Sequence, residues 1–584
     1  MKVKKGNIKR VNKKQAFMQL GIALIVLICV NIIGQYFFTR LDLTAEKRYT
    51  LTEASKNILK NLNDIVFVEV YLEGDFPSSF KRLRNATREL LDDMRAYHSD
   101  IEYEFVNPSE NPNAEERSNT YRLLIERGLK ETAVTYQGKE GVTQQIIFPG
   151  AFITYKGRRM PIQLLQDQMG VPIEEMINNS IQNLEFTFMN AIHKLSRFQK
   201  PRVAFIKGHG ELEDHFLIDV RKMLSEDYTV DNVVIDGNIN SLTTRDAKDS
   251  TNTSFRYRNL YDAIIITQPT EAFLEKDKFI IDQFIMHGGG VLWLIDPVSV
   301  SMDSLQNQNV TYATPLKLNL DDQLFEYGVR LNPDLIMDIN CLPITMVTGF
   351  TGSTPQFNLV PWYYFPLITP ISTHPIVRNI NALKTQFVST IDTVDVSGVK
   401  KTILLSSSDY SRIVRVPAPI DLNVARQKPD MKLYSKKHLP VAVLLEGKFN
   451  SLYAYRVPPS LSNEPMIGFQ EKSKETAMII VSDGDIIRNQ LHRKTGEPLP
   501  LGYDQDTKLF LGNSDFILNA ISYLADNNNL LSIRSRELKI RLMDKTIIEQ
   551  DRLFWQILNV VAPIVLIVIF GFIWIFVRKR RYTK

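Results

Sequence analysis

The 584-residue chain is poor in cysteine and histidine, with only two cysteines, Cys29 and Cys341, and eight histidines. Two thiols are too few for a disulfide framework or a thiolate metal cluster, and no pair of histidines has the His-x-x-x-His spacing of a zinc site. The sequence therefore predicts no metal site and no cofactor. It also lacks a glycine-rich loop ending in Gly-Lys-Ser/Thr, the motif that cradles nucleotide phosphates. This absence argues against ATP hydrolysis by the chain itself.

The overall composition is that of a folded protein, with 44% hydrophobic and 23% charged residues. It excludes a disordered or fibrous chain. The mean hydropathy of -0.13 is too low for a channel with many membrane spans, but it suits a globular body with one or two membrane helices.

Two uncharged apolar segments near the ends of the chain are predicted to span a membrane. Residues 16–38 contain 23 largely apolar positions, and residues 553–577 contain 25 positions without a charge. A helix needs about 20 apolar residues to cross a bilayer, so both are long enough. The first segment exceeds the roughly 7–15 apolar residues of a cleaved signal peptide, so we interpret it as a retained anchor.

Basic residues flank both predicted spans and indicate their orientation. Seven basic and no acidic residues lie in the tail 1–15, and five basic residues lie in the tail 578–584. By the positive-inside rule both tails are expected in the cytoplasm. The whole chain carries +5, so the intervening residues 15–577 carry -7. The basic excess thus belongs to the membrane-flanking tails, which argues against a nucleic-acid partner.

The body between the spans is predicted to be α/β. Its hydrophobic patterns indicate an N-terminal α/β domain at 40–170, with a short helix after Thr52 as its N-cap, and a long linking helix at 173–196. Buried strands at 202–206, 261–267 and 290–295 are typical of a doubly wound, flavodoxin-like sheet. We expect residues 200–305 and 475–530 to complete one such domain around an inserted lobe at 310–470. Residues 531–552 are expected to form a helix returning to the membrane.

The first candidate ligand site follows the first buried strand of this sheet. It comprises Lys207, Gly208, His209, Gly210 and Glu211. Open α/β folds place ligands at the carboxyl ends of their strands, and glycines there let the backbone approach a ligand. A histidine beside a glutamate also suits acid–base chemistry. The alternative is a tight strand-to-helix turn whose His and Glu side chains bond locally.

A second candidate site follows the late strand at 476–482. Asp483 and Asp485 flank a glycine and offer two carboxylates to a hard cation or another ligand. Turns after strands also favour Asp and Gly for conformational reasons, which is the alternative explanation. We assign no catalytic residue, because the strand at 261–267 is followed by Gln268 and Pro269, where a hydrolase or amidotransferase would carry a nucleophile.

Ten short motifs in order along the chain resemble those of the GldG family. They are RLDLT at 40–44, KRYTL at 47–51, FPGA at 148–151, GHGE at 208–211, YGVRLNPDL at 327–335, HPI at 374–376, LLEG at 444–447, SDGD at 482–485, GN at 512–513 and RSRE at 534–537. This family is the auxiliary, so-called substrate-binding, subunit of the gliding-motility ABC transporter of Bacteroidota. The resemblance covers nearly the whole chain.

The resemblance implies an inner-membrane protein with a periplasmic body that works with separate ATPase and permease subunits. It also implies an amidotransferase-like central domain that serves binding rather than chemistry, and it supplies no catalytic residue. We therefore expect a non-enzymatic auxiliary subunit in contact with the lipid bilayer, with a periplasmic protein or ligand as a candidate further partner. The open alternatives are a membrane-tethered enzyme that uses the Gly208–Glu211 loop and a periplasmic scaffold without a ligand.

Overall fold

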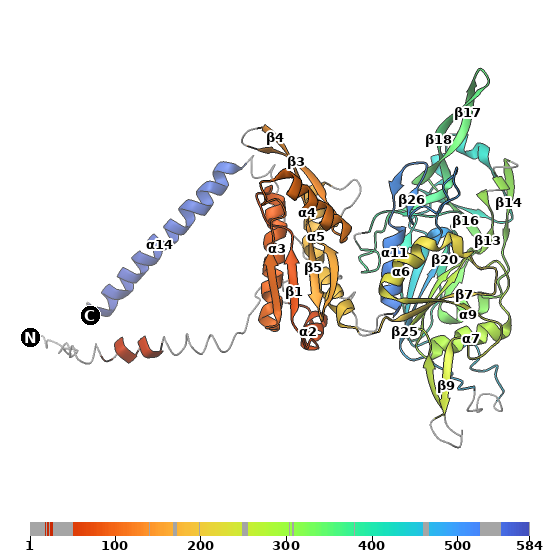
Figure 1. The fold of residues 1–584 in the computed structure, drawn as a ribbon, viewed down its shortest axis with the longest axis horizontal. Helices are drawn as coiled ribbons and strands as arrows, with labels where there is room; N and C mark the ends of the chain where they lie inside the picture. Colours follow the sequence, from red (N-terminus) through yellow and green to blue (C-terminus); the bar gives the residue numbers. More distant parts are fainter. Residues whose placement is uncertain are drawn as a thin grey trace, which may run out of the picture. The chain divides into compact units, whose positions relative to one another are not determined.

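The computed structural model describes residues 51–138, 141–166, 172–197, 199–247, 255–302, 304–305, 309–378, 380–458, 467–525 and 551–582, with seven helical positions between 18 and 26. The chain divides into two compact units, Met1–Arg536 and Glu537–Lys584. Most of the span expected at 16–38, the tail 1–15 and nearly all of the return helix expected at 531–552 lie outside the described residues. Figure 1 shows the fold along the chain.

The N-terminal part of the first unit is a four-stranded sheet with helices packed against it. Its strands lie in the order β2-β1-β5-β6, with β1 parallel to β2 and antiparallel to β5. The elements are α2 (Glu53–Lys60), β1 (Val66–Val70), α3 (Ser78–Tyr97), β2 (Ile101–Phe105), α4 (Ala114–Glu126), β5 (Gly150–Tyr155), β6 (Arg158–Gln163) and α5 (Ile173–Ser196). A separate hairpin joins β3 (Thr132–Gly138) to β4 (Gly141–Ile147).

Two of these helices show how the sequence determines this layer. The Thr52 hydroxyl accepts a hydrogen bond from the Ser55 backbone N–H, which confirms the predicted cap of α2. Helix α5 buries Leu184, Phe188 and Ile192 in the same apolar cluster as strand β1. The helix expected to link two domains is therefore a structural part of the N-terminal layer.

The central sheet has seven strands in the order β21-β24-β25-β12-β11-β7-β8. Its strands are β7 (Arg202–Lys207), β8 (Thr229–Val234), β11 (Ala263–Thr267), β12 (Gly290–Leu294), β21 (Val399–Ser406), β24 (Pro440–Gly447) and β25 (Thr476–Val481). The run from β8 to β25 is parallel, and β24 and β21 extend it in antiparallel pairing. The late strand β25 therefore lies beside β12, and two strands from within 310–470 belong to the same sheet.

Helices cover both faces of this sheet, and alternating strand residues decide which face each side chain meets. Phe205 and Ile265 pack with α6 (Ile218–Asp227) and α11 (Asn513–Ala525) on one face. Ile206 and Ile266 pack with α7 (Glu275–Met286) and α9 (Asp321–Tyr327) on the other. Burial on both faces explains why these strands are continuous apolar runs.

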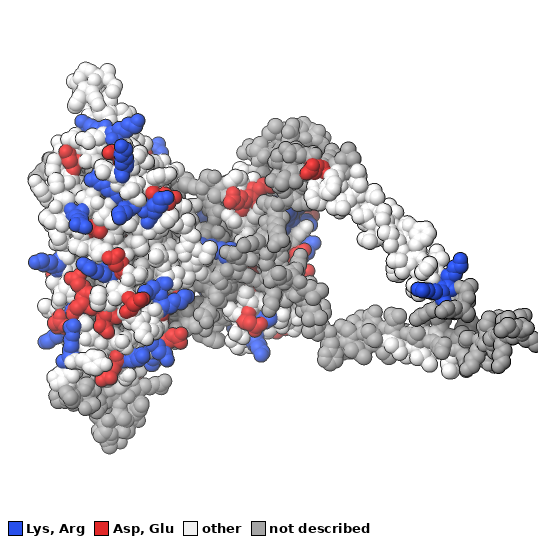
Figure 2. Space-filling view, turned by 180° about the vertical axis from the view of Figure 1, so that it is seen from behind, with Lys and Arg blue, Asp and Glu red and all other residues white. Residues whose placement is uncertain are grey.

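The rest of the first unit is built mainly from short antiparallel strands. They are β9 (Thr243–Ala247), β10 (Phe255–Asn259), β13 (Val298–Ser299), β14 (Val310–Pro315), β15 (Val329–Leu331), β16 (Asp334–Asp338), β17 (Cys341–Thr351), β18 (Thr354–Ile368), β19 (Leu383–Lys384), β20 (Ile391–Thr393), β22 (Ser411–Arg415), β23 (Ala418–Asp421), β26 (Tyr503–Asp504) and β27 (Leu509–Phe510). The long hairpin of β17 and β18 projects from the body, and its protruding tip shows no charged side chain (Figures 1 and 2).

The second unit contains helix α14 (Arg552–Tyr582). Within the described residues it is the one helix long and apolar enough to cross a membrane, over Phe554–Arg580, and none of its most apolar window is buried. Its length and composition agree with the span predicted at 553–577.

Candidate functional site

Both predicted ligand sites lie at one edge of the central sheet, where strands β7, β11, β12 and β25 have their carboxyl ends. The chain passes from β7 to β8 on one side and returns to β11 on the other, so the switch in strand order lies between β7 and β11. Ligands of open α/β folds bind in the crevice at such a point. The structure thus brings the Lys207–Glu211 segment to the position where the sequence predicted a site.

The crevice between β7 and β11 is closed by the polypeptide itself. The backbone N–H groups of Thr270 and Glu271 both donate to the His209 carbonyl, at 3.0 and 2.9 Å. The Leu212 N–H donates to the Thr267 carbonyl at 3.1 Å. Gly210 has a φ of +70°, and a Cβ there would collide with the Thr270 hydroxyl. Glycine is therefore needed at this position for close backbone packing, which is the alternative role that the sequence left open.

His209 is held at the centre of this loop with 3% exposure. Its Nδ1 lies 3.1 Å from Glu211 Oε1, and its Nε2 lies 3.2 Å from Asp277 Oδ2 on helix α7. Its ring stacks on Phe273, with 3.8 Å between the ring centroids. Burial by itself lowers the pKa of His209, but hydrogen bonds to the two carboxylates outweigh it and raise the pKa above its ordinary value.

The two ends of the predicted segment are also engaged. Lys207 forms an ion pair with Asp214, at 3.0 Å, and its ammonium donates to the Leu212 carbonyl. Glu211 is buried, and it accepts the His209 backbone N–H at 2.8 Å as well as contacting the ring. Glu211 and Asp277 therefore fix the histidine from both sides. The side chains in this segment bond to one another and to α7, with His209 and Glu211 screened from solvent.

Asp483 and Asp485 lie next to a third carboxylate, Asp296, which follows β12. The Gly484 N–H donates to Asp296 Oδ1, and the Gln268 side-chain amide donates to Asp296 Oδ2, both at 2.6 Å. Asp483 is fully buried, whereas Asp296 and Asp485 are partly exposed. The three acids form a cluster across the ends of β12 and β25, which we call the acidic cluster.

Further contacts connect the acidic cluster to its surroundings. Asp483 accepts the backbone N–H of Gln386, at 2.9 Å, from the stretch between β19 and β20. Asp485 pairs with Arg488 at 3.2 Å. Within the described residues, no group of three or more His, Cys, Asp or Glu side chains has a geometry that would hold a metal ion. The arrangement ties the central sheet to the following loops.

The acidic cluster shifts the proton affinities of its members upward. Burial and the nearby Asp485 carboxylate raise the pKa of Asp296 to about 7. Burial, followed by repulsion from Asp296 and Asp485, raises the pKa of Asp483 well above its ordinary value. Burial likewise raises the pKa of Asp485. Like charges that share a buried site cannot all ionise without cost.

We expect the stability of the protein to fall as pH rises from about 4 to about 7, through this cluster. The unfolded pKa of Asp296 is near 3.8 and its folded pKa is near 7, so the folded state binds its proton more tightly. That stabilisation is complete below pH 3.8 and is lost as pH passes through 7. Thermal denaturation of the full chain in mild detergent measures this slope. Asp296→Asn is expected to flatten it, and the exposed control Asp395→Asn is not; equal slopes in all three proteins would contradict this assignment.

Gln268 is the first residue after strand β11. It follows β11 with a left-handed φ of +50°, an uncommon conformation for a residue other than glycine. Its side chain donates to Asp296, and Gly484 packs against its Cα and Cβ, where a larger residue would clash. The turn after β11 thus has an uncommon backbone conformation and presents a side-chain amide.

Two members of this edge, Asp277 and Asp296, were missed by reading the sequence, which named Gln268 only as the residue in place of a nucleophile. Asp296 follows a buried strand just as Asp483 does, so the same rule applied to β12 would have found it. Asp277 is 68 residues from His209, and no local pattern signals that the two meet.

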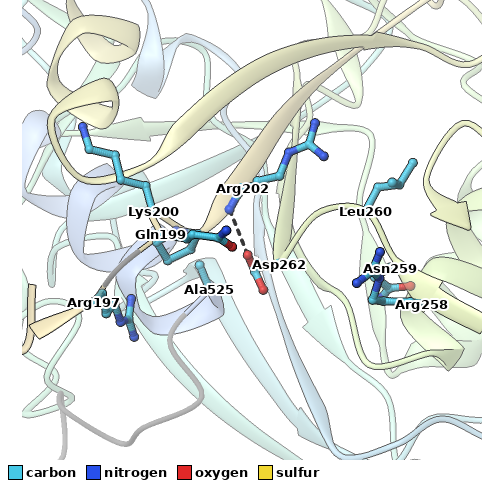
Figure 3. A pocket seen from close by; sticks show the side chains of 10 residues that line it. Arg197, Gln199, Lys200, Arg202, Arg258, Asn259, Leu260, Asp262 and Ala525 are labelled. Atoms are coloured by element: carbon cyan, nitrogen blue, oxygen red, sulfur yellow. Dashed lines mark hydrogen bonds between the residues drawn. The ribbon is translucent and has the colours of Figure 1, made fainter.

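Two cavities lie at the opposite edge, before the first residues of the parallel strands. The larger, of about 600 Å³, is lined by Arg197, Lys200, Arg202, Arg258 and Asp262, among others (Figure 3). The other, of about 390 Å³, shares Arg258, Asn259, Asp262 and Ala525 with it.

Basic residues around these cavities bond to nearby groups of the protein or lie near helix C-termini. The Lys200 ammonium donates to the Ser225 carbonyl, and Arg202 Nη2 donates to Asp231, both at 2.7 Å. The Arg202 backbone N–H donates to Asp262 at 2.9 Å, as drawn in Figure 3. Helices α5 and α11 end at this edge, and cations stabilise helix C-termini. The Lys200 and Arg202 charges thus have hydrogen-bond partners within the protein.

Comparison with known proteins gives two family matches. A family model described as an ABC-type uncharacterized transport system matches residues 200–520, which include the whole central sheet. A second model, described as a domain of unknown function, matches residues 45–154. A protein of Borreliella burgdorferi, described as uncharacterized, is 21% identical over 570 residues, covering 97% of this chain and 98% of the relative.

Two solved structures are more distant. The mmIFT52 N-terminal domain is 12% identical, with a TM-score of 0.29, over 55% of this chain and 96% of that chain. The exo-beta-1,4-mannosidase Op5Man5 from Opitutaceae bacterium strain TAV5 is 11% identical, with a TM-score of 0.16, over 76% of this chain and 51% of that chain. Scores this low support no conclusion about fold or function.

Proposed function

Because this chain belongs to the family of ABC-type uncharacterized transport systems, we propose that it is a non-catalytic, membrane-anchored auxiliary subunit of such a transporter. The observation that carries this proposal is the family match across residues 200–520, more than half of the chain. The family membership supports a transport-associated role. The finer assignment is to the auxiliary, substrate-binding subunit of a gliding-motility transporter, and it rests on the ten motifs that resemble GldG.

In this proposal, other subunits supply the ATPase activity of the transporter. The chain has no phosphate-binding loop, so a separate ATPase would supply energy and a separate permease would supply the pathway. Helix α14 and the apolar segment 16–38 would anchor the chain as a two-pass protein of the inner membrane. The basic tails favour cytoplasmic termini and a periplasmic body.

The geometry of the carboxyl edge also favours a binding or structural role over chemistry. His209 and Glu211 are screened from solvent, and Gln268 occupies the nucleophile position. The enzyme alternative requires His209 and Glu211 to reach a substrate. If the enzyme alternative were correct, His209→Asn and Glu211→Gln would each abolish the function of the protein although the variant still folds. The auxiliary role predicts that these folded variants retain that function.

Purification from native membranes tests the proposal. The tagged full-length chain, extracted in mild detergent, is expected to bring an ABC ATPase and a permease with it, identified by mass spectrometry. A tagged unrelated two-pass membrane protein serves as the control for non-specific recovery. Recovery of neither subunit would overturn the transporter role and favour a scaffold that acts alone.

A further inference from the structure

The two cavities at the edge where the parallel strands begin adjoin each other. They have volumes of about 600 and 390 Å³ and share Arg258, Asn259, Asp262 and Ala525 on their walls. Ligand pockets in proteins typically measure about 300–1,000 Å³, so each cavity has room for a small molecule or a headgroup. We call the two cavities together the amino-edge groove, and Figure 3 shows the larger of them.

The amino-edge groove is lined by more positive than negative side chains. The cations on its walls are Arg197, Lys200, Arg202, Arg258 and Lys474. In the described part of the groove one carboxylate, Asp262, stands among them. Residues 15–577 as a whole carry -7, so the groove gathers charge of the opposite sign to that of the body. Such a concentration attracts anions.

Three of these cations have no carboxylate partner in the part of the chain that the structure describes. Arg258 and Lys474 are exposed, and their side chains make no hydrogen bond or ion pair there. The Lys200 ammonium donates to a neutral group, the Ser225 carbonyl. Arg202 differs, because it forms an ion pair with Asp231 at 2.7 Å. Lys200, Arg258 and Lys474 therefore keep most of their donors available to a ligand.

Helix C-termini do not balance these three charges. Helices α7 and α11 end at the groove, where His287 and Ala525 line its wall. Each helix C-terminus is equivalent to roughly half a negative charge, so the two together offset about one positive charge. The Asp262 carboxylate offsets one more. About one positive charge is thus left over, in addition to donors that no group of the protein uses.

We propose that the amino-edge groove is a binding site for a phosphate group. The three unpaired cations come from different segments, since Arg258 lies on β10, Lys200 precedes β7 and Lys474 precedes β25. A tetrahedral phosphate accepts hydrogen bonds from several directions at once, whereas a carboxylate offers two oxygens in one plane. Arginine binds phosphate through two parallel N–H groups, and lysine binds it as a point charge.

This site goes beyond the proposed function and does not depend on it. It lies at the opposite edge of the central sheet from His209 and the acidic cluster. The phosphate group has two sources with the same chemistry, a soluble phosphate compound and the headgroup of an anionic phospholipid. The experiment below distinguishes them.

Isothermal titration calorimetry of the full-length chain in mild detergent, with inorganic phosphate as the probe, tests the site. The double variant Arg258→Gln/Lys474→Gln is expected to weaken phosphate binding about tenfold or more, because it removes two charge-assisted donors. The matched control Arg330→Gln/Lys317→Gln removes the same charge from two exposed side chains outside the groove and should bind phosphate normally. Within the described residues none of these four side chains forms a hydrogen bond or ion pair, so both variants should unfold at the temperature of the unmodified chain.

Asp262→Asn provides a variant with the opposite effect. The asparagine oxygen can still accept the Arg202 backbone N–H, which donates to Asp262 at 2.9 Å. Repulsion between the carboxylate and the phosphate is lost, so binding of inorganic phosphate should tighten about threefold. Weaker binding by this variant would contradict the position of the phosphate beside Asp262.

Native mass spectrometry of the same samples identifies the source. Phosphate binding that the double variant loses, with no phospholipid retained, supports the site and a soluble ligand. An anionic phospholipid that the control retains and the double variant loses supports the site and a lipid headgroup. Neither phosphate binding nor retained lipid in the unmodified chain, or equal behaviour of the double variant and the control, would overturn the inference. Either result would leave the transporter role intact.

Discussion

Asp282→Ala is expected to lower the free energy of unfolding by about 3–5 kcal/mol, because it leaves several buried hydrogen-bond donors without their acceptor. Asp282 lies on α7 with 0% exposure and accepts four hydrogen bonds. The donors are the Ser451 hydroxyl at 2.6 Å, the Tyr327 hydroxyl at 2.8 Å, the Gln283 amide at 2.9 Å and the Leu452 N–H at 3.1 Å.

The size of this effect follows from the hydrogen-bond donors that stay buried without an acceptor. Each donor that stays buried without an acceptor costs about 1–3 kcal/mol. Burial raises the pKa of Asp282, and the four bonds partly offset that rise, so the site depends on them. Asp282 joins α7 to α9 through Tyr327 and to the segment after β24 through Ser451. Loss of the carboxylate therefore loosens one whole face of the central sheet.

Thermal or denaturant unfolding of the purified full chain measures the change. Asp395→Ala is a matched control, because Asp395 is fully exposed and, among the described residues, pairs with Lys401 at 2.7 Å. Exposed ion pairs contribute little to stability, so this control should be near neutral. A loss of less than about 1 kcal/mol for Asp282→Ala would show that the network is not formed as described.

Trp293→Ala is expected to cost about 3–5 kcal/mol, through loss of buried area and the cavity that remains. Trp293 lies on β12 in the middle of the sheet and is 0% exposed. It packs in the same cluster as Ile266, Ile480 and Phe284, from the two neighbouring strands and from α7. Few partners in this close-packed interior can move to fill the space.

A second substitution separates volume from polarity at this position. The Trp293 Nε1 is buried without a hydrogen-bond partner in the structure. Phenylalanine removes that unpaired donor while keeping an aromatic ring, so Trp293→Phe should cost less than about 1.5 kcal/mol. Unfolding experiments on the two variants should therefore differ clearly. Equal losses would mean that the indole N–H makes an important bond, contrary to its unpaired state here.

The sequence was most informative where hydrophobic burial dominates. The parallel strands β7, β11, β12 and β25 are buried on both faces, so their apolar runs were visible before the structure. The region 310–470 was predicted only as an inserted lobe; its strands β22 and β23 were not predicted, because their pairing partners β16 and β14 lie elsewhere in the sequence. Similarly, β21 and β24 join the central sheet through long-range pairing that no local pattern encodes.

In the candidate site, too, local features were predicted from the sequence and long-range contacts were not. The position of His209 and Asp483 at strand ends followed from the sequence, because strand ends are local features. Their surroundings did not, since Asp277 comes from a helix 68 residues away and the acidic cluster combines the ends of two strands. Long-range packing determines that the loop is closed. The closed loop leaves His209 and Glu211 screened from solvent, which no motif in the sequence indicates.

The central claim is that one globular body is held outside the cytoplasm by anchors at both ends of the chain. Cysteine labelling tests it most directly, in a full-length chain whose Cys29 and Cys341 are replaced by serine. A cysteine at Ser353, in the turn between β17 and β18, should react with a membrane-impermeant maleimide in intact spheroplasts. A cysteine at Thr583 should react only after the membrane is permeabilised. Labelling of position 583 in intact spheroplasts, or protection of position 353 until lysis, would contradict the account.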